Sequence, residues 1–150
     1  VSRSLFQTNP LPVLTATDFV RYNMCVVAGY ANAGEFDSLG KQVTLHIDAS
    51  PGDTFNLKTL LASRVDAVVI DKSVFRYLLL TDTVLSKESA QITFHENILA
   101  ELPLHICFQR TTIGLKLQQA FDTALHQLDV KKIENAYFQE LESKKKLSTK

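Results

Sequence analysis

Two short apolar runs, each followed by a helical pattern, constrain the fold of this chain more than any other feature. The runs cover residues 22–28 and 65–70, and each contains several valines. Their length and branched side chains favour buried strands over helices. Helical patterns follow near residues 35–39 and 73–80. Strands that alternate with helices in this order favour parallel pairing with helices packed on the sheet, which is an α/β fold.

Further segments extend this pattern in both directions. Alternating apolar and polar residues predict a strand over 43–47, and more strands are expected at 1–7, 91–94 and 104–108. Asp53 can cap a helix whose apolar residues follow helical spacing. The central part of the chain therefore contains enough strands for one sheet.

The last forty residues are expected to be helical only. Apolar residues fall on one face of a helix from Thr112 to Leu128, and a second helix is predicted near 130–141. We therefore expect residues 1–110 to form an α/β domain with strands near both ends. Residues 111–150 are expected to form C-terminal helices.

The charge balance and the cysteines restrict the functional classes. The chain has 150 residues, with 16 Lys and Arg against 16 Asp and Glu, so no electrostatic argument points to a nucleic-acid partner. No apolar run reaches the roughly 18 residues that cross a bilayer. Cys25 and Cys107 both lie in apolar runs. Buried thiols are the favoured interpretation, and a disulfide stays open as the alternative.

No catalytic or metal-binding motif is found in the sequence. A glycine-rich phosphate loop and a G-x-S-x-G serine elbow are both absent. The histidines lack the spacing of metal ligands; they are His46, His95, His105 and His126. We expect no metal, no cofactor and no enzymatic activity. The best acid/base pair that an enzyme could use is Glu35 with Lys72.

The ends of the two apolar runs form the candidate binding site. The small-residue loop 29–34 exposes backbone N–H groups ahead of a helix, where an anion is favoured. Asp71 follows the second run, at the strand end where open α/β sheets bind ligands. Together they complement a zwitterionic amino acid. The alternative is that Asp71 only caps the helix that follows it.

Two segments carry a resemblance to a known family. Residues 26–36, VVAGYANAGEF, resemble the G-Y-x-x-x-x-E-F segment that opens the second lobe of family 3 extracellular solute-binding proteins. Residues 56–71, NLKTLLASRVDAVVID, resemble their L-x-x-L-x-x-G-R-x-D-A-x-x-x-D segment. Ser63 stands where the family usually has glycine. Residues 102–108 resemble the strand that crosses back to the first lobe, and the two C-terminal helices resemble those of the family.

The resemblance implies a fold, a function and a site. The implied fold is a periplasmic-binding-protein-like lobe, with a mainly parallel sheet flanked by helices and with hinge strands near both ends. The implied protein is periplasmic, captures a small polar solute such as an amino acid, and hands it to the membrane subunits of an ABC importer. By position, Asp71 matches the carboxylate that binds an α-amino group. The loop that meets the ligand carboxylate is matched by Gly29, Tyr30, Ala31 and Asn32; the family usually has Thr or Ser in part of this loop.

Proteins with two other functions also have this fold. One difference from the family affects how the chain is expected to assemble. A sensory ligand-binding module of a receptor is the first alternative, and a dehydratase-like enzyme is the second. The resemblance begins after the family's first-lobe segment. The C-terminal helices normally pack on that lobe, so we expect them to expose apolar faces, to dimerise, or to swap between chains.

Overall fold

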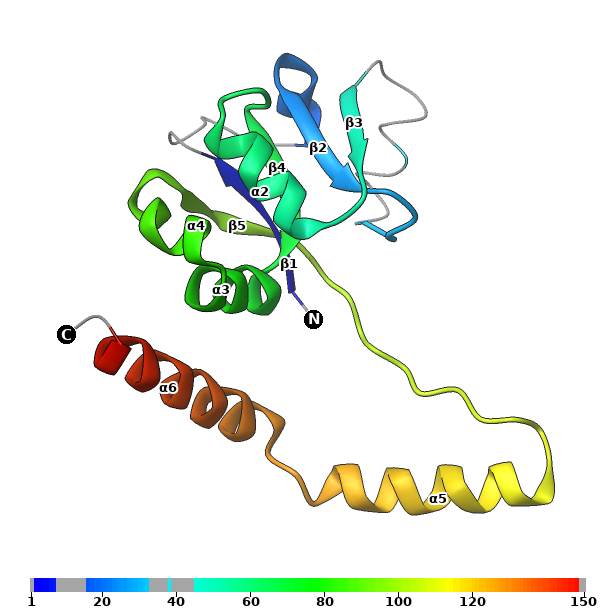
Figure 1. The fold of residues 1–150 in the computed structure, drawn as a ribbon. Helices are drawn as coiled ribbons and strands as arrows, with labels where there is room; N and C mark the ends of the chain where they lie inside the picture. Colours follow the sequence, from blue (N-terminus) through cyan, green and yellow to red (C-terminus); the bar gives the residue numbers. More distant parts are fainter. Residues whose placement is uncertain (1, 8–15, 33–37, 39–44, 149–150) are drawn as a thin grey trace. The chain divides into compact units, whose positions relative to one another are not determined.

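Five strands form one mixed sheet in the computed structural model, in the order β3-β2-β4-β1-β5 (Figure 1). The structure describes residues 2–7, 16–32, 38 and 45–148. The strands are β1 (Ser2–Gln7), β2 (Asn23–Val27), β3 (His46–Ser50), β4 (Ala67–Asp71) and β5 (Thr93–Glu101). The helices are η1 (Ala16–Arg21), α2 (Asp53–Leu61), α3 (Lys72–Thr81), α4 (Thr83–Lys87), η2 (Ser89–Gln91), α5 (Thr112–His126) and α6 (Val130–Ser148).

The sheet has a parallel half and an antiparallel half. β2 pairs in parallel with both β3 and β4, and α2 makes the crossover from β3 to β4. β1 pairs antiparallel with β4 on one side and with β5 on the other. The expected α/β fold, with parallel strands and flanking helices, is confirmed. The parallel half is the part that matters for the site, because its three strands end at one edge.

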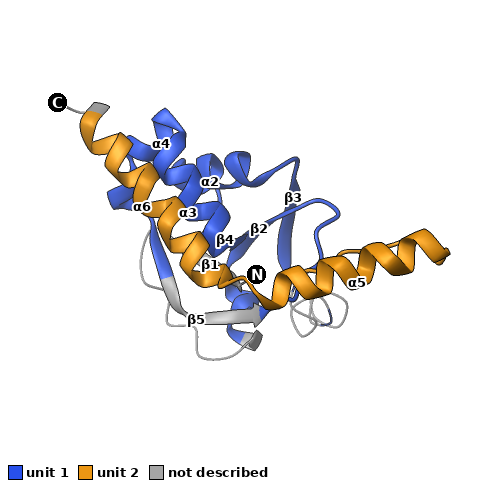
Figure 2. Cartoon of the chain, turned by 90° about the horizontal axis from the view of Figure 1, so that it is seen from below, with its two compact units in different colours: residues 1–103 blue, residues 104–150 orange. Residues whose placement is uncertain are grey.

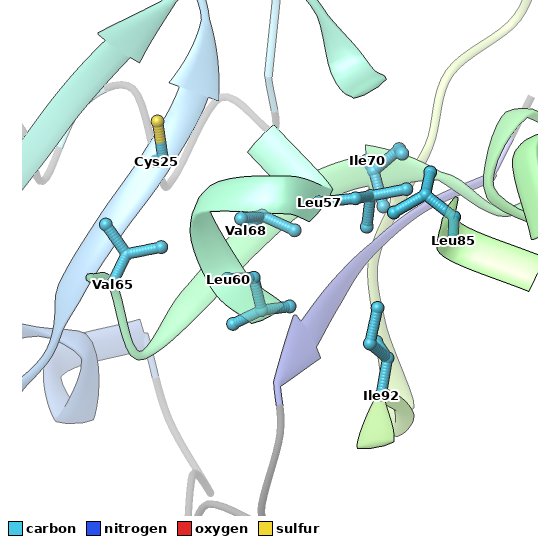
Figure 3. Close-up of a cluster of buried hydrophobic side chains, with 8 residues drawn as sticks. All are labelled: Cys25, Leu57, Leu60, Val65, Val68, Ile70, Leu85 and Ile92. Atoms are coloured by element: carbon cyan, nitrogen blue, oxygen red, sulfur yellow. The ribbon is translucent and has the colours of Figure 1, made fainter. Parts of the chain in front are cut away.

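β4 lies at the centre of the core because every residue of this strand is buried. Val68 and Ile70 face a cluster that includes Leu57 and Leu60 of α2 (Figure 3). Ala67 and Val69 face a second cluster, which contains residues of η1 and β2. A strand buried on both faces needs a continuous apolar run rather than an alternating one. The apolar run 65–70, predicted to be a buried strand, therefore corresponds to β4, the central strand of the sheet.

Aspartates at the helix N-termini set where α3 and α4 begin. Asp82 accepts hydrogen bonds from the N–H groups of Val84 and Leu85, at 2.9 and 3.0 Å, through Oδ1. Its Oδ2 lies 3.3 Å from Lys58 Nζ on α2. One carboxylate therefore caps α4 and links it to α2. Asp71 performs the same capping role for α3.

The chain divides into two compact units, residues 1–103 and 104–150 (Figure 2). The second unit contains α5 and α6. Thr111 caps α5, since its Oγ1 accepts a hydrogen bond from Gly114 N–H at 3.1 Å. Gly114 must be glycine here, because a Cβ atom at this position would lie 1.9 Å from the Gln109 carbonyl oxygen.

Several elements differ from the sequence predictions. The predicted strand 104–108 is wrong, because this segment has no regular secondary structure. A strand needs a neighbour for its N–H and C=O groups, and no strand in the described part of the chain pairs with this segment. β3 occupies 46–50 instead of 43–47, and α4 was not predicted. The predicted helix 35–39 lies outside the described residues except for Ser38, which is helical.

Candidate functional site

The carboxyl ends of β2, β3 and β4 meet at one edge of the sheet because the three strands are parallel. The loop 28–32 follows β2, the turn 51–52 leads from β3 into α2, and α3 begins directly after β4 (Figure 1). Open α/β sheets bind ligands at the carboxyl ends of their strands. We call this edge, formed by residues 28–32, 50–56 and 71–75, the carboxyl edge.

The loop after β2 is held to the neighbouring strand by backbone hydrogen bonds. Ala28 N–H donates to the Ser50 carbonyl at 2.9 Å, and Tyr30 N–H donates to the Val27 carbonyl at 3.2 Å. Gly29 has a φ of 79°, a left-handed conformation that favours glycine. Gly29, Tyr30 and Ala31 are all exposed. The loop therefore turns tightly and presents residues 29–31 to solvent.

Asn32 stabilises the far end of this loop. Its Nδ2 donates to the Tyr30 carbonyl at 3.5 Å, which is a long hydrogen bond. Residues 33 and 34 of the predicted loop, and Glu35 at the expected start of the next helix, lie outside the described residues. The structure thus places four of the predicted loop residues, 29–32.

Asp71 uses its two carboxylate oxygens differently. Oδ1 accepts hydrogen bonds from Ser73 N–H at 2.9 Å and from Val74 N–H at 3.0 Å, so the residue caps α3. Oδ2 is buried and has no hydrogen-bond partner in the described part of the chain. The whole residue is only 7% exposed. A buried carboxylate oxygen without a donor is costly, so a donor that reaches it, above all a cationic one, would stabilise the site.

The strand register brings Asp71 and the loop 28–32 to the same level of the sheet. Met24 lies opposite Ala67, and Cys25 lies opposite Val68. The printed pairing ends there, and counting three residues onward in the same register would bring Ala28 opposite Asp71. On the other side of β4, Asp71 pairs with Arg3 of β1. The sequence predicted that the loop and Asp71 would share an edge, and the topology puts them on adjacent strands.

Two further polar residues at the carboxyl edge were missed in the sequence analysis. Ser50 is buried at the end of β3, and its Oγ donates to the Gly52 carbonyl at 3.2 Å. Asn56 in α2 is fully buried, and neither of its amide atoms has a hydrogen-bond partner in the described part of the chain. Its signal in the sequence was an asparagine inside the apolar stripe of α2, beside Leu57 and Leu60. With Asp71, these residues are the buried polar side chains of the described chain.

The cysteines differ in environment. Cys25 is buried, and burial together with the nearby Asp48 carboxylate raises the pKa of its thiol. Cys107 is exposed, so the prediction that it is buried is wrong. It lies in the segment 104–108, which is not part of the sheet. Both thiols are free, and the open alternative of a disulfide is not realised in the structure.

The described residues contain no group of three or more His, Cys, Asp or Glu that could hold a metal ion. Among these residues, no helix has the length and apolar character of a membrane span. Of the acid/base pair that an enzyme could use, Glu35 lies outside the described residues. Lys72 Nζ lies over the Phe94 ring, 5.6 Å from its centroid.

Comparisons with known proteins identify the fold. The sequence matches no protein-family model and no curated protein. A mutant of ArgBP from T. maritima matches 95% of this chain with a TM-score of 0.67 and 15% identity. An ancestral arginine-binding protein bound to glutamine matches 95% of the chain, with a TM-score of 0.62 and 14% identity. A protein described as the second substrate binding domain of a putative amino acid ABC transporter from Streptococcus pneumoniae matches 95%, with a TM-score of 0.53 and 15% identity.

The likeness confirms the fold that the family resemblance implied. The chain has the fold of amino-acid-binding proteins, and the matched structures are binding proteins rather than enzymes. It spans 58% of the length of the ArgBP mutant and of the ancestral protein, and 60% of the Streptococcus pneumoniae protein. At these low identities the likeness concerns the arrangement of the chain and not its ligand.

Proposed function

We propose that this chain is part of a periplasmic solute-binding protein that captures a small polar solute, such as an amino acid, for an ABC importer. The proposed ligand site is the carboxyl edge, with Gly29, Tyr30, Ala31 and Asn32 in the loop and Asp71 at the end of β4. The fold supports this proposal because amino-acid-binding proteins share it. The chemistry of Asp71 carries the proposal further than the fold alone.

The observation that carries the proposal is the unpartnered Oδ2 of Asp71, which has no donor in the described part of the chain. Oδ1 makes both hydrogen bonds that cap α3, and Oδ2 makes none. An ammonium group that donates to Oδ2 would satisfy its lone pairs and form a charge-assisted hydrogen bond. Capping and ligand binding, the two roles considered for Asp71, are therefore compatible, because each would use a different oxygen.

The ligand carboxylate is proposed to meet the loop 28–32. Gly29, Tyr30 and Ala31 are exposed there, one strand away from Asp71. A tight turn with a glycine in the left-handed region lets a ligand approach the backbone closely. An α-amino acid has its ammonium and carboxylate groups on one carbon, which suits two anchor points on adjacent strands.

The first lobe of such a protein is proposed to close over this edge. The matched structures extend beyond the part that this chain covers, which is 58% of the ArgBP mutant. On α5, apolar side chains four residues apart are exposed: Ile113, Leu117, Phe121 and Leu125. We propose that this stripe packs on the first lobe. Size-exclusion chromatography of the isolated chain tests the alternative of a homodimer or helix swap, for which a dimer peak would be evidence.

Binding can be tested by NMR on the full ¹⁵N-labelled chain, because this method detects weak ligands. Glycine, alanine, leucine, phenylalanine, glutamine and arginine are added one at a time. The proposal predicts shifts at the amides of residues 28–32 and 72–74 for at least one of them. The matching N-acetyl amino acid lacks the ammonium group and is expected to leave these amides unchanged.

Asp71→Asn is the matched variant, because the amide oxygen can still accept from Ser73 and Val74 while the negative charge is removed. We expect the variant to keep its fold and to lose amino-acid binding about tenfold or more, as expected for a hydrogen bond to a charged group. Unchanged affinity in Asp71→Asn would remove Asp71 from the site. No response to any of the six amino acids would contradict the proposed function itself.

A further inference from the structure

We propose that the solute is an amino acid with an apolar or aromatic side chain, and that Tyr30 and Phe55 select it. This inference rests on the proposed function, that an amino acid binds at the carboxyl edge. Tyr30 lies in the loop after β2, and Phe55 lies in the first turn of α2, directly after β3. Both aromatic residues therefore belong to the edge that holds Asp71.

The exposure of these two rings is the first observation. Tyr30 is 46% exposed and Phe55 is 53% exposed. Single exposed apolar side chains are common on protein surfaces, so these two rings are distinguished by their position at the edge that holds Asp71 and not by exposure alone. Small-molecule sites are lined mainly by apolar and aromatic side chains, with few polar groups for orientation. The carboxyl edge has this composition.

The strand pairing brings the two residues to the same end of the sheet. Val27, at the end of β2, lies opposite Ser50, at the end of β3. The hydrogen bond from Ala28 N–H to the Ser50 carbonyl, 2.9 Å long, continues this pairing beyond β2. Tyr30 follows two residues after Ala28, and Phe55 follows five residues after Ser50. Both rings thus start from neighbouring strand ends that are joined by a hydrogen bond.

The charged groups at this edge argue against an acidic ligand side chain. Within residues 28–32, 50–56 and 71–75, which the structure describes, Lys72 is the only basic residue. Its ammonium group lies over the ring of Phe94 in β5. Asp71 is already assigned to the α-ammonium group. Asp53, the other acidic residue of this edge, is half-buried and has an interaction within the chain. Val74 adds a smaller apolar side chain, so the two aromatic rings are the largest exposed side chains left for the ligand.

Tyr77 provides a matched control for both aromatic residues. It is 42% exposed, close to the exposure of Tyr30, but it lies in the middle of α3 and not in the carboxyl edge. A general loss of surface aromatic area would affect all three positions in the same way. A ligand effect would be confined to Tyr30 and Phe55.

The test measures dissociation constants of the full chain by NMR titration with phenylalanine, leucine, alanine, glutamine and arginine. Phenylalanine and leucine are expected to bind about tenfold more tightly than alanine, the discrimination that an apolar subsite commonly provides. Tyr30→Ala and Phe55→Ala are each expected to lower the affinity for phenylalanine about fivefold to tenfold. Both variants should lower the affinity for alanine much less than the affinity for phenylalanine, and Tyr77→Ala should change neither affinity.

The outcomes separate this inference from the proposed function. Tighter binding of arginine or glutamine than of phenylalanine overturns the inference, and so does a Phe55→Ala variant with unchanged affinity for phenylalanine. In either case the proposed function stands as long as binding is sensitive to Asp71→Asn. If no amino acid perturbs the spectrum, both are overturned. Because both rings are exposed, the unliganded spectra of the variants are expected to show an intact fold.

Discussion

Asn23 and Asp66 hold each other through two short hydrogen bonds. Asn23 N–H donates to Asp66 Oδ2 at 2.8 Å, and Asp66 N–H donates to the Asn23 carbonyl at 2.8 Å. Asn23 begins β2, and Asp66 directly precedes β4. The pair therefore fixes the register of the two parallel strands at the end of the sheet opposite to the carboxyl edge. The aspartate in the segment R-V-D-A thus has a structural explanation.

We predict that Asp66→Ala lowers the free energy of unfolding by about 1 kcal/mol, because Asn23 N–H loses its acceptor. Urea denaturation measures this change, and amide exchange at Asn23 should become faster. Asp66→Asn retains an acceptor oxygen and should be closer to the parent chain. Equal stability of Asp66→Ala and the parent would show that the side-chain hydrogen bond does not stabilise the strand pair.

Replacing Ser63 with glycine is predicted to stabilise the chain. Ser63 has a φ of 53°, and it follows α2 in a Schellman turn, in which Arg64 N–H donates to the Thr59 carbonyl at 3.2 Å. A Cβ atom is unfavourable in this conformation, whereas glycine has no such penalty. We expect Ser63→Gly to raise the free energy of unfolding by about 0.5–1 kcal/mol.

Ser63→Ala is the control, because it retains the Cβ atom and should give no comparable gain. The measurement is the urea midpoint at constant slope, which separates a stability change from a change in the denatured state. A Ser63→Gly variant that is less stable than the parent would contradict this explanation.

The link between α2 and α4 is predicted to weaken in acid. The Leu85 N–H group is the largest cause that lowers the pKa of Asp82, and the Lys58 ammonium also lowers it. A carboxylate whose pKa is lowered by folding contributes stability above its unfolded pKa of about 3.9, and this contribution is lost as the pH falls through the folded value. Stability should therefore fall more steeply between about pH 5 and pH 3 than it does in Asp82→Asn.

Urea midpoints of the two proteins across this range provide the test. The asparagine side chain of the Asp82→Asn variant can still cap α4 but carries no charge, so the difference isolates the charge of the carboxylate. Parallel pH profiles for the parent chain and Asp82→Asn would count against a contribution from the Asp82 charge.

The two thiols are predicted to react with iodoacetamide at very different rates. Cys25 is buried, and its pKa is raised by burial and by the Asp48 carboxylate, so little thiolate is present near neutral pH. Cys107 is exposed. Mass spectrometry should show one rapid alkylation in the native chain and a second only after denaturation. Cys107→Ser should remove the rapid phase, and rapid labelling in that variant would mean that Cys25 is accessible.

The sequence predicted the elements whose signals are local. The continuous apolar run that forms β4 is the pattern expected of a strand buried on both faces. Asp71 stands directly before α3, the helix that it caps. The antiparallel pairing of β1 with β4 and β5 could not be predicted, because it joins segments that are distant in the sequence. The error at 104–108 has the same origin, since alternation indicates an extended chain but not a partner.

The residues of the site that follow strand ends could be predicted from the sequence. The residues that are distinguished by their burial could not. The loop 28–32 and Asp71 follow from the position of the parallel strands. Asn56 was missed because a single polar residue in an apolar helical stripe gives no indication that its amide is fully enclosed. Phe55 is one of the apolar residues at helical spacing that predicted the helix after Asp53, and the structure exposes its ring.

The apolar stripe of α5 has a consequence for the life of this chain in a cell. Chaperones and proteases recognise exposed apolar residues as a mark of incomplete folding. Ile113, Leu117, Phe121 and Leu125 present such a mark even when α5 is fully formed. The amount of protein that survives quality control should therefore depend on how quickly this stripe becomes covered after synthesis.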